Sequence, residues 1–385
     1  MPIPSDSEKQ RSRRCQQIIV DEIKHNQQPI SFQRYMQLCL YTEEVGYYES
    51  NSDIFGSKGD FTTSPENGNF FAVAFAAHIN KIKQQLNTFS VIEVGAGSGK
   101  FAADLIQAMK QNDCLPQCYY IVEKSAALRR RQKQYLASAQ SDCNIVWIEN
   151  LDEPIECGVV IANEVLDALP VTLVSVLKNS VSERCVALDE KGDLRFVDIP
   201  AIEYLSNLIG ERLPSSVLNK SGSPYQCDIN LLLDDFIQQI TSFVKQGIFF
   251  YIDYGYARHE YYHEQRSMGT LICHYQHVAN EQPLLWPGLQ DISCNVDFTA
   301  LAEAGTHCDL QVNSYSTQAH FLLASDALEK YLTEDKYVNV IERKAEIKRL
   351  MMPAEMGERF QAMVLTKNID FKSNQFTTKN MLHRL

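Results

Sequence analysis

The 385-residue sequence lacks a long apolar run, because no stretch approaches the roughly 18 consecutive apolar residues that a membrane-spanning helix needs. The N-terminal residues 1–17 also lack the apolar segment of a secretory signal. Arginines among serines at 11–14 are faintly similar to a mitochondrial transit peptide, but the nearby acidic residues argue against one. We expect a soluble, cytoplasmic protein of bacterial type and disfavour the mitochondrial matrix.

Positive charge is scarce: 36 Lys and Arg stand against 48 Asp and Glu, a formal net charge of −12. This balance disfavours nucleic acid and anionic membranes as partners. The 11 cysteines are odd in number and never spaced as CxxC, which indicates reduced thiols rather than a disulfide framework. A hydrophobic content of 45% with 22% charged residues is typical of a globular protein.

The pattern of apolar residues predicts an α/β fold. Two helices are expected within 12–45, a loop at 46–65 and a helix at 66–85. Short apolar runs then alternate with helical patterns, which favours βαβ units and a parallel sheet. We predict strands at 89–94, 119–123, 144–148, 158–162 and 247–253, then a helix at 297–304, a strand at 310–315, a helical run at 319–345 and a last strand at 360–366.

The fifth predicted strand follows the fourth by some eighty residues, far more than a βα crossover requires. Residues 171–245 therefore contain an insertion, which we interpret as a substrate-recognition subdomain. We expect N-terminal helices and a site-covering flap in 1–88, and a core made of 89–170 and 246–385.

A glycine-rich loop, Gly95-Ala96-Gly97-Ser98-Gly99, ends the first predicted strand and leads into a helix. Such a loop lets a ligand approach the backbone at a helix N-terminus. It is not a P-loop, because the spacing of GxxxxGK[ST] is absent and Phe101 stands at the Ser/Thr position. The dinucleotide motif GxGxxG would need glycine at Lys100, which weakens an NAD-dependent alternative.

Two acidic residues accompany the loop. Glu123 ends the second predicted strand, where a carboxylate can accept hydrogen bonds from both hydroxyls of a ribose. Glu93 precedes Gly95 by two residues and suits a ligand with a positive charge near the loop. S-adenosylmethionine carries an ammonium and a sulfonium and has no pyrophosphate, so it is the favoured cofactor. The alternative is an ordinary strand-to-helix turn with two surface carboxylates.

The fourth predicted strand ends in Asn163 and Glu164, with Asp167 three residues further on. Residues at the carboxyl ends of parallel strands face the crevice that binds ligands. Glu164 is the first candidate to accept a proton, and Asp167 would share its face if the turn is helical. Asp253, at the end of the fifth strand, and His277, in the loop beyond, are alternative catalytic residues, although either could be structural.

A competing site is the HExxH sequence His259-Glu260-Tyr261-Tyr262-His263, which on a helix would bind zinc. The metzincin extension is absent, since Arg266 replaces its glycine, and no third ligand stands at a recognised spacing. We interpret this match as coincidence and expect no metal.

Motifs along nearly the whole chain resemble the MidA family of S-adenosylmethionine-dependent methyltransferases, which includes a mitochondrial complex I assembly factor that is a protein arginine methyltransferase. The motifs that carry the resemblance are ISFQRYMQLCLYTEEVGYY (30–48), KGDFTTSPE (58–66), VIEVGAGSGKFAADLI (91–106), YIVEKSAALRRRQKQYL (120–136), IANEVLDALPV (161–171), IDYGY (252–256), GTLICHYQH (269–277), PGLQDISCNVDF (287–298) and MMPAEMGERF (351–360).

The resemblance implies a class I methyltransferase fold with a Rossmann-like, mostly parallel seven-stranded sheet. It also implies methyl transfer to a protein, with arginine as the acceptor and a respiratory complex subunit as a candidate partner. Carried over by position, Gly95, Gly97 and Gly99 would lie along the methionine part of the cofactor, Glu123 on the ribose, and Asn163 and Glu164 beside the transferable methyl group. Glu93 and Asn150 complete the predicted cofactor-binding residues. Asp60, Thr62 and Ser64 would be polar contacts of a flap over the site.

Two positions depart from the family pattern. Asp228 stands where relatives usually carry glutamate, and Ser314 where glycine is expected. Because residues 172–245 match no familiar pattern, substrate identity transfers less securely than the cofactor. A non-catalytic assembly or scaffold protein that retains this fold is the alternative function.

Overall fold

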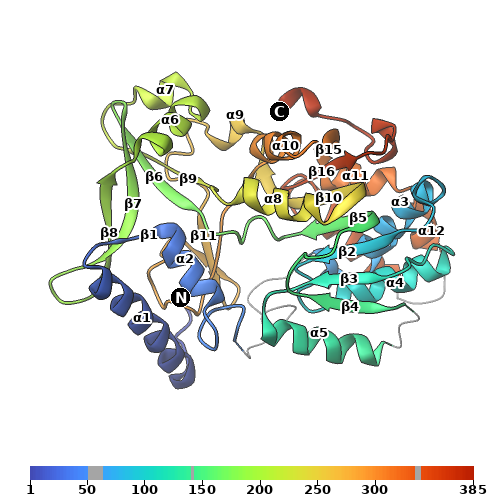
Figure 1. Ribbon diagram of the computed structural model, residues 1–385, viewed down its shortest axis with the longest axis horizontal. Helices are drawn as coiled ribbons and strands as arrows, with labels where there is room; N and C mark the ends of the chain where they lie inside the picture. Colours follow the sequence, from blue (N-terminus) through green and yellow to red (C-terminus); the bar gives the residue numbers. More distant parts are fainter. Residues whose placement is uncertain (51–63, 140–142, 334–339) are drawn as a thin grey trace.

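The computed structural model describes residues 1–50, 64–139, 143–333 and 340–385. A large sheet with helices on both faces forms one part of the molecule, and a smaller antiparallel sheet lies beside it, at the left of Figure 1. Among the helices of the described ranges, none is long and apolar enough to cross a membrane.

The large sheet contains every predicted strand, in an order that reverses at its centre. Across the sheet the strands are β15 (Gln311–Thr317), β16 (Phe360–Lys367), β10 (Val244–Tyr256), β5 (Ile155–Asn163), β2 (Ser90–Val94), β3 (Tyr119–Val122) and β4 (Ile145–Ile148). The strands from β10 to β4 are parallel, while β16 is antiparallel to both neighbours. The predicted α/β fold with a mostly parallel seven-stranded sheet is confirmed; a short strand, β14 (Val296–Asp297), also pairs with the end of β10.

Helices bury both faces of this sheet. One face is covered by α3 (Phe70–Leu86), α4 (Lys100–Gln111), α11 (Gln318–Ala324), α12 (Leu328–Thr333) and α13 (Val340–Met351), and the other by α8 (Leu233–Ser242) and α10 (Phe298–His307). In β5, Val159 and Ile161 enter the first core and Val160 enters the second. Because side chains alternate across a strand, burial on both faces explains the continuous apolar runs in the sequence.

Two predicted helices differ in extent. The helix expected at 66–85 begins at Phe70, after a 3₁₀ turn at Ser64–Asn67. The run expected at 319–345 is divided, because Asp326 adopts a left-handed φ of 60° and the Ser325 hydroxyl accepts from the Ala327 amide, which ends α11.

The smaller sheet combines the N-terminus with the predicted insertion. Its strands are β1 (Ile30–Ser31), β7 (Ser180–Leu188), β6 (Thr172–Leu177), β9 (Tyr225–Ile229) and β8 (Leu194–Pro200), covered by α6 (Glu203–Arg212) and α7 (Ser215–Leu218). The helices α1 (Asp6–Asn26) and α2 (Phe32–Tyr41) pack into one core with this sheet and with a third sheet, β12 (Val278–Asn280), β11 (Ile272–Tyr275) and β13 (Asp291–Ser293). The Ser31 hydroxyl accepts from the Arg34 amide and caps α2. By contrast α8, although within 171–245, packs on the large sheet.

The centre of the large sheet depends on two facing glycines. Gly247 of β10 pairs with Gly158 of β5, and a Cβ on Gly247 would lie 2.0 Å from the Gly158 carbonyl oxygen. We therefore expect Gly247→Ala to lower the free energy of unfolding by about 1–3 kcal/mol or more, because the two strands must separate. Urea denaturation of the purified protein measures this loss.

Gly210 in the exposed part of α6 provides the control, because no heavy atom lies within 4 Å of a Cβ placed there. Gly210→Ala should raise stability by roughly 0.5–1 kcal/mol. Equal effects of the two substitutions would contradict this account of the sheet.

Candidate functional site

A cavity of about 1040 Å³ lies at the carboxyl ends of the parallel strands. This is the edge at which open α/β sheets bind ligands. The described residues that line it include seven predicted site residues: Glu93, Gly95, Gly97, Glu123, Asn150, Asn163 and Glu164. Asp167, in the turn after β5, is an eighth predicted site residue that lines it.

The glycine loop connects β2 to α4 in a conformation that favours glycine. Gly95, Gly97 and Gly99 have φ values of 67°, 51° and 85°. Gly99 is the N-cap of α4 and, unlike the first two glycines, is not among the lining residues. A Cβ on Gly95 would lie 3.0 Å from the Val165 side chain, so this glycine also lets the loop approach the turn after β5. The loop thus presents backbone to the cavity beside a helix N-terminus.

Glu123 is held in place by α5 (Ala126–Ser138). Its Oε1 accepts from the Ser125 amide at 2.9 Å, and its Oε2 accepts from Gln132 Nε2 at 3.0 Å. Gln132 Nε2 also donates to the Gly97 carbonyl at 3.1 Å, so one amide joins the glycine loop to Glu123. Each carboxylate oxygen can accept a second hydrogen bond, which leaves Glu123 able to bind a diol.

Gln132 is fully buried in α5 and was not among the predicted site residues. Its carbonyl oxygen accepts from Trp147 Nε1 at 3.1 Å. The sequence indicates such a supporting role only through a glutamine among the apolar positions of a helical pattern. A buried amide requires hydrogen-bond partners.

Glu93 lies beneath the loop, with 4% of its surface exposed. Tyr119 donates to its Oε2 at 2.7 Å. Burial raises the pKa of Glu93 to about 7, and the charge of Glu123 adds to the shift despite the tyrosine hydrogen bond. A cation bound at this end of the cavity would favour the ionised form.

The end of β5 places Asn163 and Glu164 at the cavity. Glu164 has a φ of 54°, and its Oε1 accepts from the Ser64 amide and from Asn163 Nδ2, both at 3.0 Å. Burial raises the pKa of Glu164 to about 8, with a further contribution from the charge of Asp253. Such a group binds a proton readily near neutral pH.

Asp253 has a different position from the one predicted. Its carboxylate is buried below the turn after β5, where Oδ2 accepts from the amides of Val165, Leu166 and Asp167 at 2.9–3.2 Å. Burial raises its pKa to about 7, although these amides favour the ionised form. Asp253 is absent from the lining of the cavity, so its geometry is that of a positioning residue.

Asp167 lies in this turn, which is not helical, so the shared helical face expected for Glu164 and Asp167 does not form. Both side chains nevertheless line the cavity. Burial raises the pKa of Asp167, and the charges of Asp253, Asp291 and Glu164 raise it further.

His277 is not brought to the site. It is exposed in the tight turn between β11 and β12, with a φ of 62°. His274, three residues earlier in β11, lines the cavity instead. The sequence could not separate them, because which histidine faces inward depends on where the strand ends and the turn begins.

Of the predicted flap residues, Asp60 and Thr62 lie outside the described residues. Ser64 is described, and its amide contacts Glu164 as noted. Close by, Ser98 of the glycine loop donates to Glu66 at 2.5 Å, which connects the loop to the 3₁₀ turn Ser64–Asn67.

The HExxH sequence does not lie on one helix, because α9 (Arg258–Tyr261) ends before His263. Tyr261 and Tyr262 are buried in the core of the smaller sheet. Across the ranges that the structure describes, no group of three His, Cys, Asp or Glu side chains could hold a metal ion.

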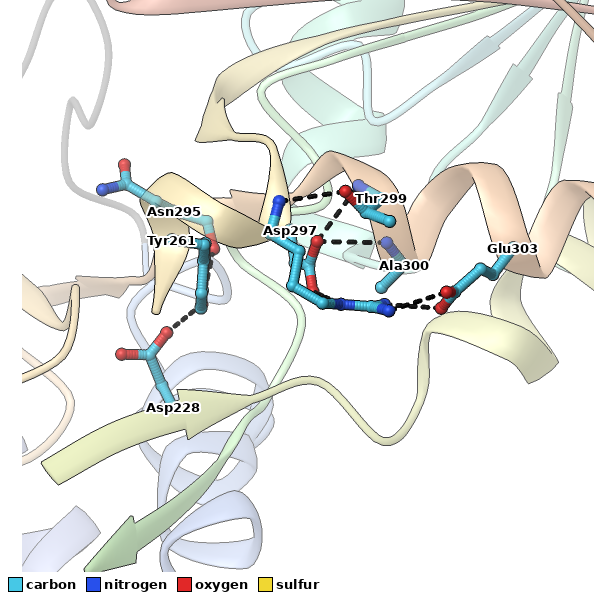
Figure 2. Close-up of polar contacts among 8 residues, drawn as sticks. Asp228, Tyr261, Asn295, Asp297, Thr299, Ala300 and Glu303 are labelled. Atoms are coloured by element: carbon cyan, nitrogen blue, oxygen red, sulfur yellow. Dashed lines mark hydrogen bonds and ion pairs between the residues drawn. The ribbon is translucent and has the colours of Figure 1, made fainter. Parts of the chain in front are cut away.

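The two departures from the family pattern are buried. Asp228 accepts from Tyr261, as Figure 2 shows, and from the amide and hydroxyl of Thr270 at 2.6 and 2.8 Å. A Cβ on Gly269 would lie 2.6 Å from its Oδ1, so the space around this short acid is filled. Ser314 lies where the register between β15 and β16 shifts.

The raised pKa of Glu164 predicts how stability changes with pH. The folded state holds a proton there up to about pH 8, whereas the unfolded chain releases it near its ordinary value of 4.5. Stability from this group is therefore full below pH 4.5 and is lost as pH rises through 8. Without ligands, Glu164→Gln should raise the midpoint of thermal unfolding at pH 8 by about 2 °C or more, and by less at pH 5.

Differential scanning calorimetry at both pH values measures this effect. The exposed Glu211 provides the control, because Glu211→Gln removes the same charge from the surface. A stability gain for Glu164→Gln that is as large at pH 5 as at pH 8 would refute the assignment.

Comparisons with known proteins agree with this geometry. Residues 70–316 match the family described as "Putative S-adenosyl-L-methionine-dependent methyltransferase". A Burkholderia thailandensis protein with bound S-adenosyl-homocysteine is 32% identical, with a TM-score of 0.92 and full coverage of both chains. Two relatives are named as the mitochondrial protein arginine methyltransferase NDUFAF7 or its homolog. The Caenorhabditis elegans protein is 26% identical over 78% of this chain and 73% of its own length. The Danio rerio protein is 24% identical over 86% of this chain and 82% of its own length.

The cavity fits the cofactor that this family uses. Gly95 and Gly97 leave backbone open to the methionine part, and a buried Glu93 is suited to its ammonium. Glu123 retains acceptor capacity for the ribose, and Asn150 lines the cavity after β4. The cofactor is S-adenosylmethionine, and the chain belongs to this family of S-adenosylmethionine-dependent methyltransferases.

Proposed function

We propose that the protein transfers a methyl group from S-adenosylmethionine to an arginine side chain of another protein. The observation that carries this proposal is the pair of carboxyl groups, Glu164 and Asp167, in one cavity with the glycine loop. Carboxylates pair with a guanidinium by charge-assisted hydrogen bonds. The relatives named as protein arginine methyltransferases support the same acceptor.

The cofactor supplies a methyl group on a sulfonium, which is the reactive part of this chemistry. An arginine acceptor is protonated near neutral pH and must lose a proton during transfer. A guanidinium bound beside Glu164 favours its ionised form. We assign proton acceptance to Oε2 of this carboxylate, because both hydrogen bonds found among the described residues are made to Oε1. Asp253 has a positioning role, since it holds the amides of the turn that follows Glu164.

We further propose that the smaller sheet and α1–α2 recognise the substrate protein, because Tyr41 and Tyr48 extend from this part into the cavity wall. A respiratory complex subunit is a candidate substrate. The proposed location is the cytoplasm, supported by the 11 cysteines, all free thiols.

Glu164→Gln tests the assignment of the proton acceptor. The purified protein is incubated with tritiated S-adenosylmethionine and a cell extract, and the acid hydrolysate is analysed for methylarginine. We expect the wild type to form methylarginine and the variant to be about 10²–10⁴-fold slower, with unchanged affinity for S-adenosyl-homocysteine. Label found in methyllysine, or an equally active variant, would contradict the proposal; binding without any turnover would favour the scaffold alternative.

A second experiment examines Glu93. Because its pKa is raised to about 7, it must lose a proton to pair with the ammonium of the cofactor. We expect the dissociation constant of S-adenosylmethionine to increase as pH falls below 7, by up to about tenfold per unit. In Glu93→Gln binding should be weaker and its pH dependence flatter, as measured by calorimetry between pH 5.5 and 8.5.

Gly97→Val is the control for this titration and should abolish binding, because Gly97 has a left-handed φ of 51° beside the cavity. A pH dependence that persists in Glu93→Gln would exclude Glu93 as its origin.

A further inference from the structure

Part of the cavity wall comes from outside the large sheet. It consists of residues from the N-terminal segment and the three-stranded sheet: Tyr41, Tyr48, His274, Asp291 and Ser293. None of these was predicted as a site residue from the sequence. In the register of β11 and β13, His274 lies directly across from Asp291, so both side chains project from the same face toward the cavity.

This wall is attached to the turn that carries Glu164 and Asp167. The amide of Cys294, three residues after Asp291, donates to the carbonyl oxygen of Asp167 at 3.0 Å. The amide of Asn295 donates to the Thr270 hydroxyl at 2.9 Å. The position of Asp291 relative to Asp167 is therefore set by backbone hydrogen bonds.

The next residues continue this attachment. Arg258 makes ion pairs with Asp297 at 3.2 Å and with Glu303 at 2.5 Å, and Asp297 caps α10 through the Thr299 and Ala300 amides (Figure 2). Tyr261 donates to the Asn295 carbonyl at 3.1 Å. Segment 294–300, which follows β13, is thus held by contacts to Tyr261 and Arg258.

Asp291 is buried, with 5% of its surface exposed, and its Oδ1 accepts from the Tyr48 hydroxyl at 2.8 Å. Its charge raises the pKa of both Glu164 and Asp167, so the three carboxyl groups are close enough to repel one another. Burying three carboxyl groups in one space has a free-energy cost, and a guanidinium bound among them would offset part of that cost.

Tyr41 and Tyr48 give the same wall an aromatic component. Their rings stack with centroids 5.6 Å apart and an interplanar angle of 23°. The Tyr41 hydroxyl donates to the Ala168 carbonyl at 2.7 Å, so both hydroxyl groups are directed to protein acceptors. A planar guanidinium combines five N–H donors with a face that stacks on aromatic rings, so it suits this wall better than a neutral amide or a compact ammonium.

We propose that Asp291, oriented by Tyr48, is a specificity-determining residue that pairs with the acceptor guanidinium from the side of the cavity supplied by the three-stranded sheet. This inference rests on the proposed function. Glu164 and Asp291 belong to different sheets, so a guanidinium between them requires both parts of the molecule. Neutral side chains of similar shape gain nothing from the pairing.

The test compares two ligands of matched shape on the full-length protein saturated with S-adenosyl-homocysteine. Blocked arginine carries the guanidinium, and blocked citrulline replaces it with a neutral urea. Saturation-transfer NMR titrations give the affinity of each ligand for the wild type, Asp291→Asn and Tyr48→Phe. Glu281→Gln is the control, because it removes an exposed acid shortly before β13.

We expect the wild type and Glu281→Gln to prefer arginine at least tenfold. Asp291→Asn should reduce that preference to near unity, and Tyr48→Phe should reduce it partly. Binding of S-adenosyl-homocysteine should change less than twofold, and thermal unfolding should show that the variants remain folded. A purely structural role for Asp291 would change stability without changing the ratio of the two affinities.

Two outcomes would overturn the inference: no preference for arginine in a wild type that binds S-adenosyl-homocysteine, or an unchanged preference in Asp291→Asn. Both proposals are supported if the wild type prefers arginine in the NMR titration and forms methylarginine without methyllysine, while Glu164→Gln is inactive. Wild-type protein that methylates only lysine would instead contradict the proposed function, whatever the NMR result.

Discussion

The carboxylate of Asp253 organises the site, because it accepts hydrogen bonds from three consecutive amides after Glu164. Those amides point toward Asp253 only if the chain turns sharply at the end of β5. Glu164 makes that turn with a left-handed φ. This turn places the side chain of Asp167 at the cavity, and the carbonyl oxygen of Asp167 accepts a hydrogen bond from the Cys294 amide. One buried carboxylate on β10 therefore fixes the end of β5 and the point at which the three-stranded sheet is attached.

Local sequence was sufficient to predict the large sheet and the cofactor end of the site. The central strands β2, β5 and β10 contain buried runs of Val, Ile and Phe. The loop at 95–99 needs glycine because each of its three glycines has a positive φ. Glu93 lies near the end of β2 and Glu123 directly follows β3. The apolar pattern of the sequence predicts where both strands end. These features depend on neighbours in the sequence or on the parallel arrangement of adjacent strands, so a single sequence contains the information.

The acceptor end could not be predicted in the same way. Tyr48 and Asp291 are 243 residues apart and meet only because α1, α2 and the three-stranded sheet share one core. His277 was predicted as a catalytic residue, whereas His274 lines the cavity, because the apolar pattern does not fix the turn in the β11–β12 hairpin. Asp253 ends the strand predicted at 247–253, as a ligand-binding residue would, yet its amide partners are brought to it only when the turn after β5 is folded. Each difference arises from long-range packing rather than from local propensity.

The charges of the cavity connect its architecture to its chemistry. Burial raises the pKa of Glu93 and Asp253 to about 7 and that of Glu164 to about 8, so the empty site holds protons that free carboxyl groups would release. A cation that enters must displace some of these protons, and its binding is therefore coupled to ionisation of the site. A neutral ligand does not gain from this exchange. Desolvation disfavours the ionised form of these acidic residues, and a cationic ligand offsets that cost. Desolvation also keeps Glu164 more basic than a free carboxylate, so that its ionised form can accept the proton that a guanidinium must lose.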